Sequence, residues 1–174
     1  MNNLRSEGVR GDYVFEELAE NHRQPVMDIF NYFISTTHAA FPGREVSYDI
    51  FDRFLEMTHG YPRLAITRGA GEVVGFAFLR PYHVADSFAR TAEITYFIRP
   101  EHTRQGLGTA ILDLFTRRCR EMGIDSILAP VSSRNPVSLG FHRKNGFREC
   151  GRFLKIGRKW GEDFDVVWMQ KHLD

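Results

Sequence analysis

The chain has 174 residues, 43% of them hydrophobic, which is enough to bury the core of one domain. Its 23 basic and 22 acidic residues leave a formal net charge of +1, so we expect neither a nucleic acid nor a membrane surface as a partner. The N-terminus lacks the apolar core of a secretory signal, and no apolar run is long enough to span a membrane.

Cysteine and histidine usage argues against a disulfide or a metal centre. Cys119 and Cys150 are far apart and form no CxxC motif. The seven histidines are scattered, without the spacing of a metal-binding helix. We therefore expect no metal, and a reducing cytoplasm as the location.

The first half of the chain alternates helical and extended patterns. Residues 1–11 are expected to be a loose tail, and a single domain is expected over 12–174. Apolar spacing predicts the following elements up to the middle of the chain: a strand over 12–18, a helix over 22–36, a loop over 37–46, a helix over 47–58 with Ser47 as N-cap, and strands over 63–67, 73–79 and 92–98.

The second half continues this alternation. It is predicted to contain a helix over 107–122 with Gly123 at its C-cap, a strand over 126–131, a helix over 136–144 with Asn135 as N-cap, and strands over 147–154 and 164–170. Strands before, between and after helices predict an α/β or α+β domain, with a mixed central sheet flanked by helices.

A glycine-rich turn separates the strand over 92–98 from the long helix. Gly106 and Gly108 allow positive φ and close approach of a ligand to the backbone. The free N–H groups of the following helical turn suit a phosphate. The dinucleotide fingerprint is incomplete because position 111 is isoleucine, and the Gly-Lys-Ser/Thr of a nucleotide phosphate loop is absent. An ordinary strand-to-helix turn is the alternative.

Polar residues also line one face of the helix over 136–144. Asn135, Ser138 and His142 stand at i, i+3 and i+7, while Leu139 and Phe147 are expected to pack inward. Asn135 is either a simple N-cap or a ligand contact, and both uses are compatible.

These motifs together resemble a known family. The order strand, Arg-Gln-Gly-x-Gly, helix is similar to the pyrophosphate loop of the Gcn5-related N-acetyltransferases (GNAT), and Lys-Asn-Gly-Phe at 144–147 is similar to the end of their second motif. Ile-Phe-Asn-Tyr-Phe in the first helix, Ala-Ala-Phe at 39–41, Arg-Thr-Ala-Glu at 90–93 and Val-Val-Trp-Met-Gln near the C-terminus resemble the phosphinothricin or methionine sulfoximine acetyltransferase subfamily. The resemblance extends from about residue 12 to 172.

The resemblance implies acetyl-CoA as acetyl donor and a set of residues that contact it. The strand is expected to bind pantetheine through its backbone, the loop to bind pyrophosphate, and the second motif to face the thiol. The implied contacts are Tyr96, Phe97, Ile98, Arg104, Gln105, Gly106, Leu107, Gly108, Thr109, Asn135, Ser138 and Lys144.

The resemblance also implies two catalytic residues. Glu93, seven residues before Pro100, is the expected general base that removes a proton from the acceptor ammonium. His142 is the expected acid, donating a proton or hydrogen bond to the CoA sulfur as an imidazolium. The alternatives are a solvent-facing strand carboxylate for Glu93 and a helical histidine that only touches the cofactor for His142.

The implied acceptor is a small-molecule primary amine, an amino acid or analogue of the phosphinothricin, methionine sulfoximine or sulfone type, acetylated by direct attack in a ternary complex. Its expected contacts are Phe41, Phe78, Arg80, His83 and Arg90. Arg-Pro-Tyr-His at 80–83 departs from the Ser-Pro-Phe-Arg common in the family, which leaves phosphinothricin itself in question. A protein N-terminus or polyamine as acceptor, or an acyl-CoA sensor without turnover, are the alternatives. The subfamily also implies a homodimer.

Overall fold

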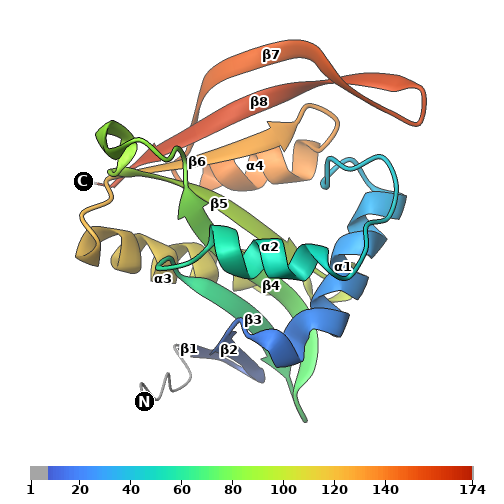
Figure 1. The fold of residues 1–174 in the computed structure, drawn as a ribbon, viewed down its shortest axis with the longest axis vertical. Coiled ribbons are helices and arrows are strands. Elements are labelled where there is room, and N and C mark those ends of the chain that lie inside the picture. The colour runs from blue at the N-terminus through green and yellow to red at the C-terminus, as the bar shows by residue number, and fades with distance from the viewer. Residues whose placement is uncertain (1–7, 174) are drawn as a thin grey trace.

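The computed structural model describes residues 8–173. Those residues build an eight-stranded sheet in the order β1-β2-β3-β4-β5-β6-β8-β7, drawn in Figure 1. The strands are β1 (Gly8–Arg10), β2 (Tyr13–Glu17), β3 (Arg63–Arg68), β4 (Glu72–Pro81), β5 (Thr91–Ile98), β6 (Ser126–Ser132), β7 (Arg148–Lys159) and β8 (Glu162–His172). Within the described residues β5 and β6 pair in parallel and the other neighbours are antiparallel. The mixed sheet flanked by helices is thereby confirmed.

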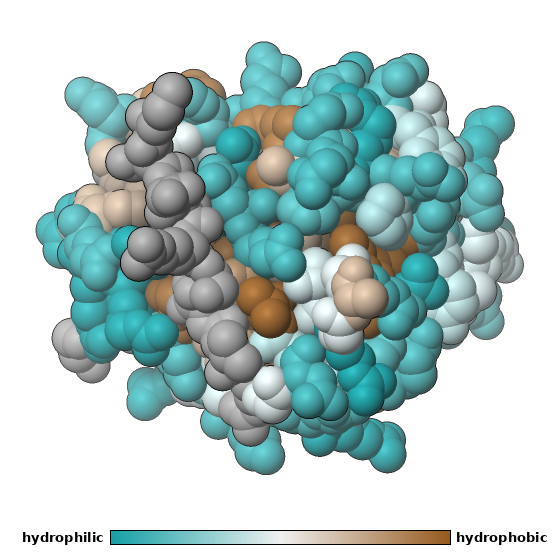
Figure 2. All heavy atoms as spheres, turned by 90° about the horizontal axis from the view of Figure 1, so that it is seen from below, coloured by the Kyte–Doolittle hydropathy of each residue, from teal (hydrophilic) through white to brown (hydrophobic). Residues whose placement is uncertain are grey.

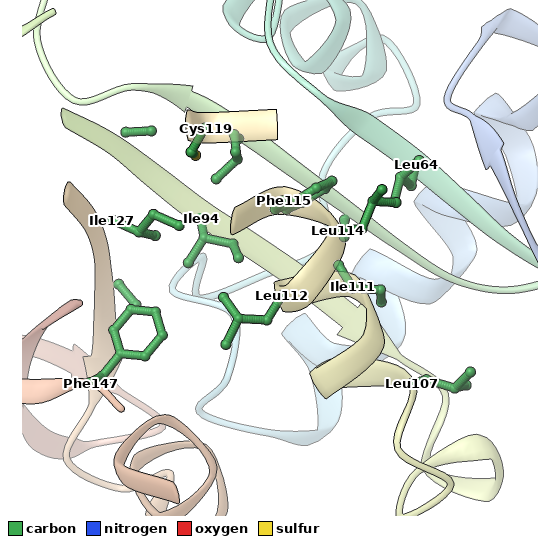
Figure 3. Packing of buried hydrophobic residues seen from close by; sticks show 14 of the residues in the cluster. Leu64, Ile94, Leu107, Ile111, Leu112, Leu114, Phe115, Cys119, Ile127 and Phe147 are labelled. Carbon is green, nitrogen blue, oxygen red and sulfur yellow. The ribbon is translucent and has the colours of Figure 1, made fainter. Parts of the chain in front are cut away.

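Helices cover both faces of this sheet (Figure 1). They are α1 (Arg23–Thr36), α2 (Ile50–Met57), α3 (Leu107–Glu121) and α4 (Pro136–Lys144). The apolar faces of α1 and α2 join one buried cluster, whereas α3 belongs to a second cluster on the other face. Figure 3 shows side chains of α3, among them Ile111 and Phe115, directed towards Leu64, Ile94 and Ile127 of the sheet.

Several details differ from the sequence-based expectations. β7 continues to Lys159 instead of ending at residue 154, and β8 extends two residues beyond the expected strand at each end. Residues 8–10 of the expected tail form β1, paired with β2, while residues 1–7 lie outside the described residues. Ser47 is not the N-cap of α2, because the helix begins at Ile50 after Asp49, and the Ser47 hydroxyl bonds the Asp49 side chain at 3.0 Å. Met122, expected in the core stripe of α3, is 41% exposed.

The feature that positions the site is the separation of β5 from β6. The two strands pair only where Thr91–Glu93 lies beside Ser126–Leu128. Beyond that point β6 continues along β8 to Ser132, whereas β5 continues along β4 to Ile98. The outer backbone edge of β5 after Glu93 therefore borders an opening in the sheet instead of a strand.

The surface shown in Figure 2 indicates no particular function. Figure 2 shows a face that is largely hydrophilic, with small hydrophobic areas between polar side chains. Within the described residues, helices of the length and apolarity that a membrane crossing demands are absent. Residues 8–173 also hold no group of three histidine, cysteine or carboxylate side chains arranged to bind a metal ion.

Candidate active site

A cleft of about 340 Å³ lies where β5 leaves β6. It is walled by α1, α2 and the segment after α1 on one side, and by β6 and α4 on the other. Its lining residues are Phe30, Ala39, Ala40, Phe41, Pro42, Phe54, Met57, Phe78, Arg80, Glu93, Ile94, Thr95, Tyr96, Phe97, Ala129, Pro130, Val131, Asn135, Ser138 and His142. Both expected catalytic residues line this one cleft.

Glu93 is a buried carboxylate inside the cleft, not a solvent-facing one. Its side chain is 7% exposed, and Arg80 on β4 is its direct cross-strand partner. The Arg80 guanidinium donates a hydrogen bond of 2.6 Å to Glu93 Oε1. A buried carboxylate needs such a partner, and register-matched positions on neighbouring strands hold the two groups together.

His142 of α4 and Tyr96 of β5 form a second pair of side chains in the cleft. The Nδ1 of His142 lies 2.7 Å from the Ser138 carbonyl oxygen, which can only accept, so Nδ1 carries the hydrogen. Burial lowers the pKa of His142, while the Ser138 carbonyl acts in the opposite direction. Burial therefore favours a neutral imidazole rather than the expected imidazolium. In the neutral form Nε2 is an acceptor, and the Tyr96 hydroxyl donates to it at 2.5 Å.

The hydroxyl of Tyr96 is a feature that sequence reasoning missed, because only the backbone of this residue was singled out. Burial raises the pKa of Tyr96 well above its ordinary range, so the phenol keeps its hydrogen. Its ring stacks on His142 with a centroid distance of 5.6 Å. The tyrosine and the histidine come from β5 and α4, 46 residues apart, and no local spacing predicts their contact.

The loop before α3 has the expected positive φ at Gly106 but not at Gly108. Gly106 is the N-cap of α3 at φ 77, and Arg104 also has positive φ, at 61. Gly108 has no positive φ, contrary to expectation. It is needed for close packing instead, because a Cβ there would lie 3.0 Å from the Phe141 ring of α4. The first turn of this helix presents unpaired N–H groups and the positive end of its dipole to the solvent.

The buried side chains of Tyr13 and His102 pack against the loop before α3. The Tyr13 hydroxyl donates to Gln105 Oε1 at 3.0 Å and lies 2.9 Å from His102 Nδ1. The Gln105 side chain is thus turned towards β2, which leaves its backbone to face a ligand. The Thr109 hydroxyl bonds Asn145 at 3.2 Å and ties the loop to the end of α4.

On α4 the polar face divides into residues that reach the cleft and one that does not. Asn135 caps the helix, since its Oδ1 accepts from the Ser138 N–H at 3.1 Å, which confirms the expected N-cap. Asn135, Ser138 and His142 also line the cleft. Lys144 is exposed and lies outside the lining, although it was expected among the cofactor contacts.

The expected acceptor residues divide in the same way. Phe41, Phe78 and Arg80 line the cleft. Arg90 does not, because its 77% exposed side chain pairs with Asp125 at the start of β6. His83 also lies outside the lining, in the exposed turn after β4, where its Nδ1 accepts from the Ala85 N–H at 3.0 Å.

Lys159 holds one wall of the cleft in place, although it belongs to none of the expected motifs. Lys159, at the end of β7, is 2% exposed. Its Nζ donates to the carbonyl oxygens of Thr37 at 2.7 Å and Ala40 at 2.9 Å. Nearby, Phe41 stacks on Phe164 of β8 with an angle of 9° between the rings. The β7–β8 hairpin, which reaches towards this segment in Figure 1, therefore holds the segment after α1 against the cleft.

Comparison with known proteins shows which proteins this chain is similar to. Residues 26–147 match the model described as the acetyltransferase (GNAT) family. An L-methionine sulfoximine/L-methionine sulfone acetyltransferase of Pseudomonas aeruginosa is 34% identical over 115 residues, 66% of this chain and 67% of the relative. The L-amino acid N-acyltransferase MnaT of Escherichia coli is 28% identical over 151 residues, 86% of this chain and 87% of the relative.

The fold also matches solved structures. The acetyltransferase yncA of Salmonella typhimurium, determined with its cofactor acetyl-CoA, superposes with a TM-score of 0.84 and 26% sequence identity. The match covers 94% of this chain and 95% of that one. Nearly all of the described fold is therefore shared with a protein whose structure holds acetyl-CoA.

Proposed function

The chain belongs to the acetyltransferase (GNAT) family, and on that premise we propose that it transfers acetyl from acetyl-CoA to the primary amine of an amino acid or amino acid analogue. The observation that carries the proposal is the buried Glu93 carboxylate in the cleft where β5 leaves β6. The enzyme class follows from the family, whereas the acceptor and the mechanism are our proposal.

Acetyl-CoA would be held by backbone more than by side chains. The N–H groups of the turn from Arg104 to Thr109 and the dipole of α3 suit the pyrophosphate. The unpaired edge of β5 at Tyr96, Phe97 and Ile98 suits the pantetheine amides, in the manner of an added strand. Both features depend on the backbone, so they tolerate changes of side chain in this turn.

Glu93 begins the chemistry. An ammonium has no lone pair, so Glu93 first accepts a proton from the acceptor, directly or through one water. The amine nitrogen then bonds the thioester carbonyl carbon, and backbone N–H groups of β5 stabilise the negative oxygen. The C–S bond breaks and the sulfur leaves as a thiolate. The second proton that the nitrogen must lose to become an amide passes to this thiolate, directly or through water. We assign no covalent acetyl-enzyme, because Cys119 is buried in α3 and Cys150 is exposed on β7, both outside the cleft lining.

The departing sulfur would meet the Tyr96–His142 pair. In the free protein the single hydrogen of the Tyr96 hydroxyl is donated to His142 Nε2, which carries no hydrogen of its own. The hydroxyl would donate to the thiolate by turning this hydrogen from Nε2 to the sulfur, and His142 holds the hydroxyl in position until then. This assignment replaces our sequence-based expectation of an imidazolium acid.

Thiol release from acetyl-CoA, measured with a panel of L-amino acids and the product confirmed by mass spectrometry, tests the proposal. Glu93→Gln is expected to lower kcat by about 10²- to 10⁴-fold at constant acetyl-CoA affinity, the usual contribution of a general base. The matched control is Glu72→Gln, at an exposed position at the start of β4. Unchanged activity in Glu93→Gln at every pH would remove Glu93 as base. Acetyl-CoA binding without turnover of any amine would favour the sensor.

The homodimer and the cytoplasmic location are also part of the proposal. β7 is the edge strand of the sheet and exposes Phe153, Leu154 and Ile156, with Leu154 74% exposed. A long apolar edge is an aggregation hazard unless something covers it, and a second copy of the chain would do so. Light scattering should then give twice the 20.2 kDa mass of the chain, and a monomer would refute it. The unpaired Cys119 and Cys150 suit a reducing compartment.

A further inference from the structure

The charges in the cleft are balanced and few. Among the described residues that line it, Arg80 and Glu93 are the charged side chains, and His142 is neutral in the hydrogen-bonding arrangement described above. Arg80 and Glu93 are joined at 2.6 Å, so the lining has no net charge. A ligand that separates this ion pair must supply equal and opposite charges, or it leaves one charge unmatched.

An amino acid zwitterion supplies both charges at once. Its carboxylate can form an ion pair with the planar guanidinium of Arg80, and its ammonium can form one with the carboxylate of Glu93, the proposed base. The Arg80 side chain is 38% exposed, so its guanidinium can turn towards a ligand without leaving a buried charge unpaired. The ion pair of the free protein would thus be replaced by two ion pairs to the acceptor.

The surface beside this pair is apolar and partly aromatic. Along the same sheet face, the next cross-strand pair is Phe78 with Thr95, and the one after is Phe76 with Phe97. Each step of two residues is about 7 Å, roughly the reach of a phenylalanine or methionine side chain beyond its α-carbon. A side chain that leaves the Arg80–Glu93 pair along the strand therefore lies over Phe78.

Helical side chains complete this apolar surface. Phe54 of α2 packs on Phe78 with a centroid distance of 5.3 Å, and Phe30 of α1 packs edge-on to Phe97 at 5.4 Å. Met57, at the end of α2, lines the cleft as well. Aromatic rings and a thioether attract flat or polarisable apolar groups and offer no donor to an anion.

We infer that, within the proposed amino-acid acetyltransferase function on which this inference rests, the preferred acceptor is an α-amino acid with one carboxylate and an apolar side chain, aromatic or thioether. A second anion, as in phosphinothricin, would lie over Phe78 and Phe97 without a cation, since Arg80 is already engaged by the α-carboxylate. The neutral oxygens of a sulfone would lose water there with few donors in return. We therefore expect kcat/KM to be highest for phenylalanine and methionine, lower for methionine sulfone and lowest for phosphinothricin.

Wild-type kinetics test this order directly. We would measure kcat/KM for thiol release with L-phenylalanine, L-methionine, L-methionine sulfone, L-phosphinothricin and phenethylamine, which lacks the carboxylate. Phenylalanine or methionine should exceed phosphinothricin by at least about tenfold, or about 1.4 kcal/mol. Phenylalanine should exceed phenethylamine by a similar factor, because an unmatched Arg80 discriminates against an acceptor without a carboxylate.

A charge added to the apolar wall gives a second test. Met57→Lys should raise the phosphinothricin to phenylalanine ratio of kcat/KM by about tenfold, whereas the matched Met122→Lys, on the exposed end of α3, should leave it unchanged. Phosphinothricin turned over as well as phenylalanine by the wild type, or an unchanged ratio in Met57→Lys, would overturn the specificity while the transferase function stands. Absence of thiol release with every amino acid would instead refute the proposed function itself.

Discussion

Gly75 is the position where a single added methyl group tests how β4 packs against β5, the strand that carries Glu93. It lies on β4 opposite Ile98 of β5. A Cβ at Gly75 would lie 2.7 Å from the Phe97 carbonyl oxygen, 2.8 Å from Ile66 Cδ1 and 3.1 Å from Ile98 Cα. Two of these three atoms are backbone, so relief requires that β4 and β5 move apart and carry Glu93 with them.

The cost follows from these distances. Overpacking of this kind costs about 1–3 kcal/mol, and the lower chain entropy of unfolded alanine returns about 0.4–1 kcal/mol. For a chain of this size a net loss near 1.5 kcal/mol lowers Tm by about 3–6 °C. Urea unfolding followed by tryptophan fluorescence measures the free energy, and thiol release measures the accompanying fall in kcat.

A matched glycine separates packing from propensity. Gly140 lies inside α4 with no atom within 4 Å of the added Cβ. Gly140→Ala should therefore raise the free energy of unfolding by up to about 1 kcal/mol through helix propensity. If Gly75→Ala proved as stable and as active as the wild type while Gly140→Ala behaved as expected, the argument that β4 and β5 are held at their closest approach would be wrong.

Two further predictions concern groups that the cleft depends on. Lys159→Met should raise the acceptor KM by about tenfold and change acetyl-CoA affinity little, because the carbonyls of Thr37 and Ala40 lose their donor. The control is Lys155→Met, at an exposed position on the same hairpin. Equal effects of the two substitutions would show that Lys159 does not hold the segment after α1 against the cleft. Burial lowers the pKa of His142 below its ordinary 6.5, so the unfolded chain binds the proton more readily and stability falls as pH drops below about 6.5. In urea unfolding between pH 7.5 and 5.5, His142→Gln should make this loss of stability with falling pH less steep. Tyr96→Phe should lower kcat and retain the loss of stability. An equally steep loss of stability in His142→Gln would show that His142 is not buried as a neutral group.

Periodicity predicted the elements of the fold well, because most of them carry one strongly apolar face. The helix over 136–144 was located to the residue, since Asn135 and Pro136 fix its start and Asn145-Gly146 its end. The strand predicted over 92–98 also has the alternation that a strand requires: Ile94, Tyr96 and Ile98 pack with the α3 cluster, and Phe97 packs with the α1–α2 cluster. Local chemistry is sufficient for such features.

Long-range contacts were beyond this kind of reasoning. Lys159 bonds residues about 120 positions earlier in the chain, and nothing in its neighbourhood marks it as buried. The pairing of Arg80 with Glu93 depends on the β4–β5 register, which an intervening turn of uncertain length leaves open. That same turn decides that Arg80 reaches the cleft while Arg90, on the far side of the turn, pairs with Asp125.

The two faces of β5 explain how one strand could serve both substrates in the proposed reaction. Odd-numbered side chains Glu93, Thr95 and Phe97 face the helices α1 and α2 and the proposed acceptor, whereas Tyr96 faces α4 and the proposed thioester. The period of two fixes this division, so a shift of the strand by one residue would exchange the base and the tyrosine. Gly75 holds β5 at close range on one side, and β6 departs on the other. The strand is therefore fixed along one edge and open along the other, which is the arrangement that a backbone-bound donor and a side-chain-bound acceptor both require.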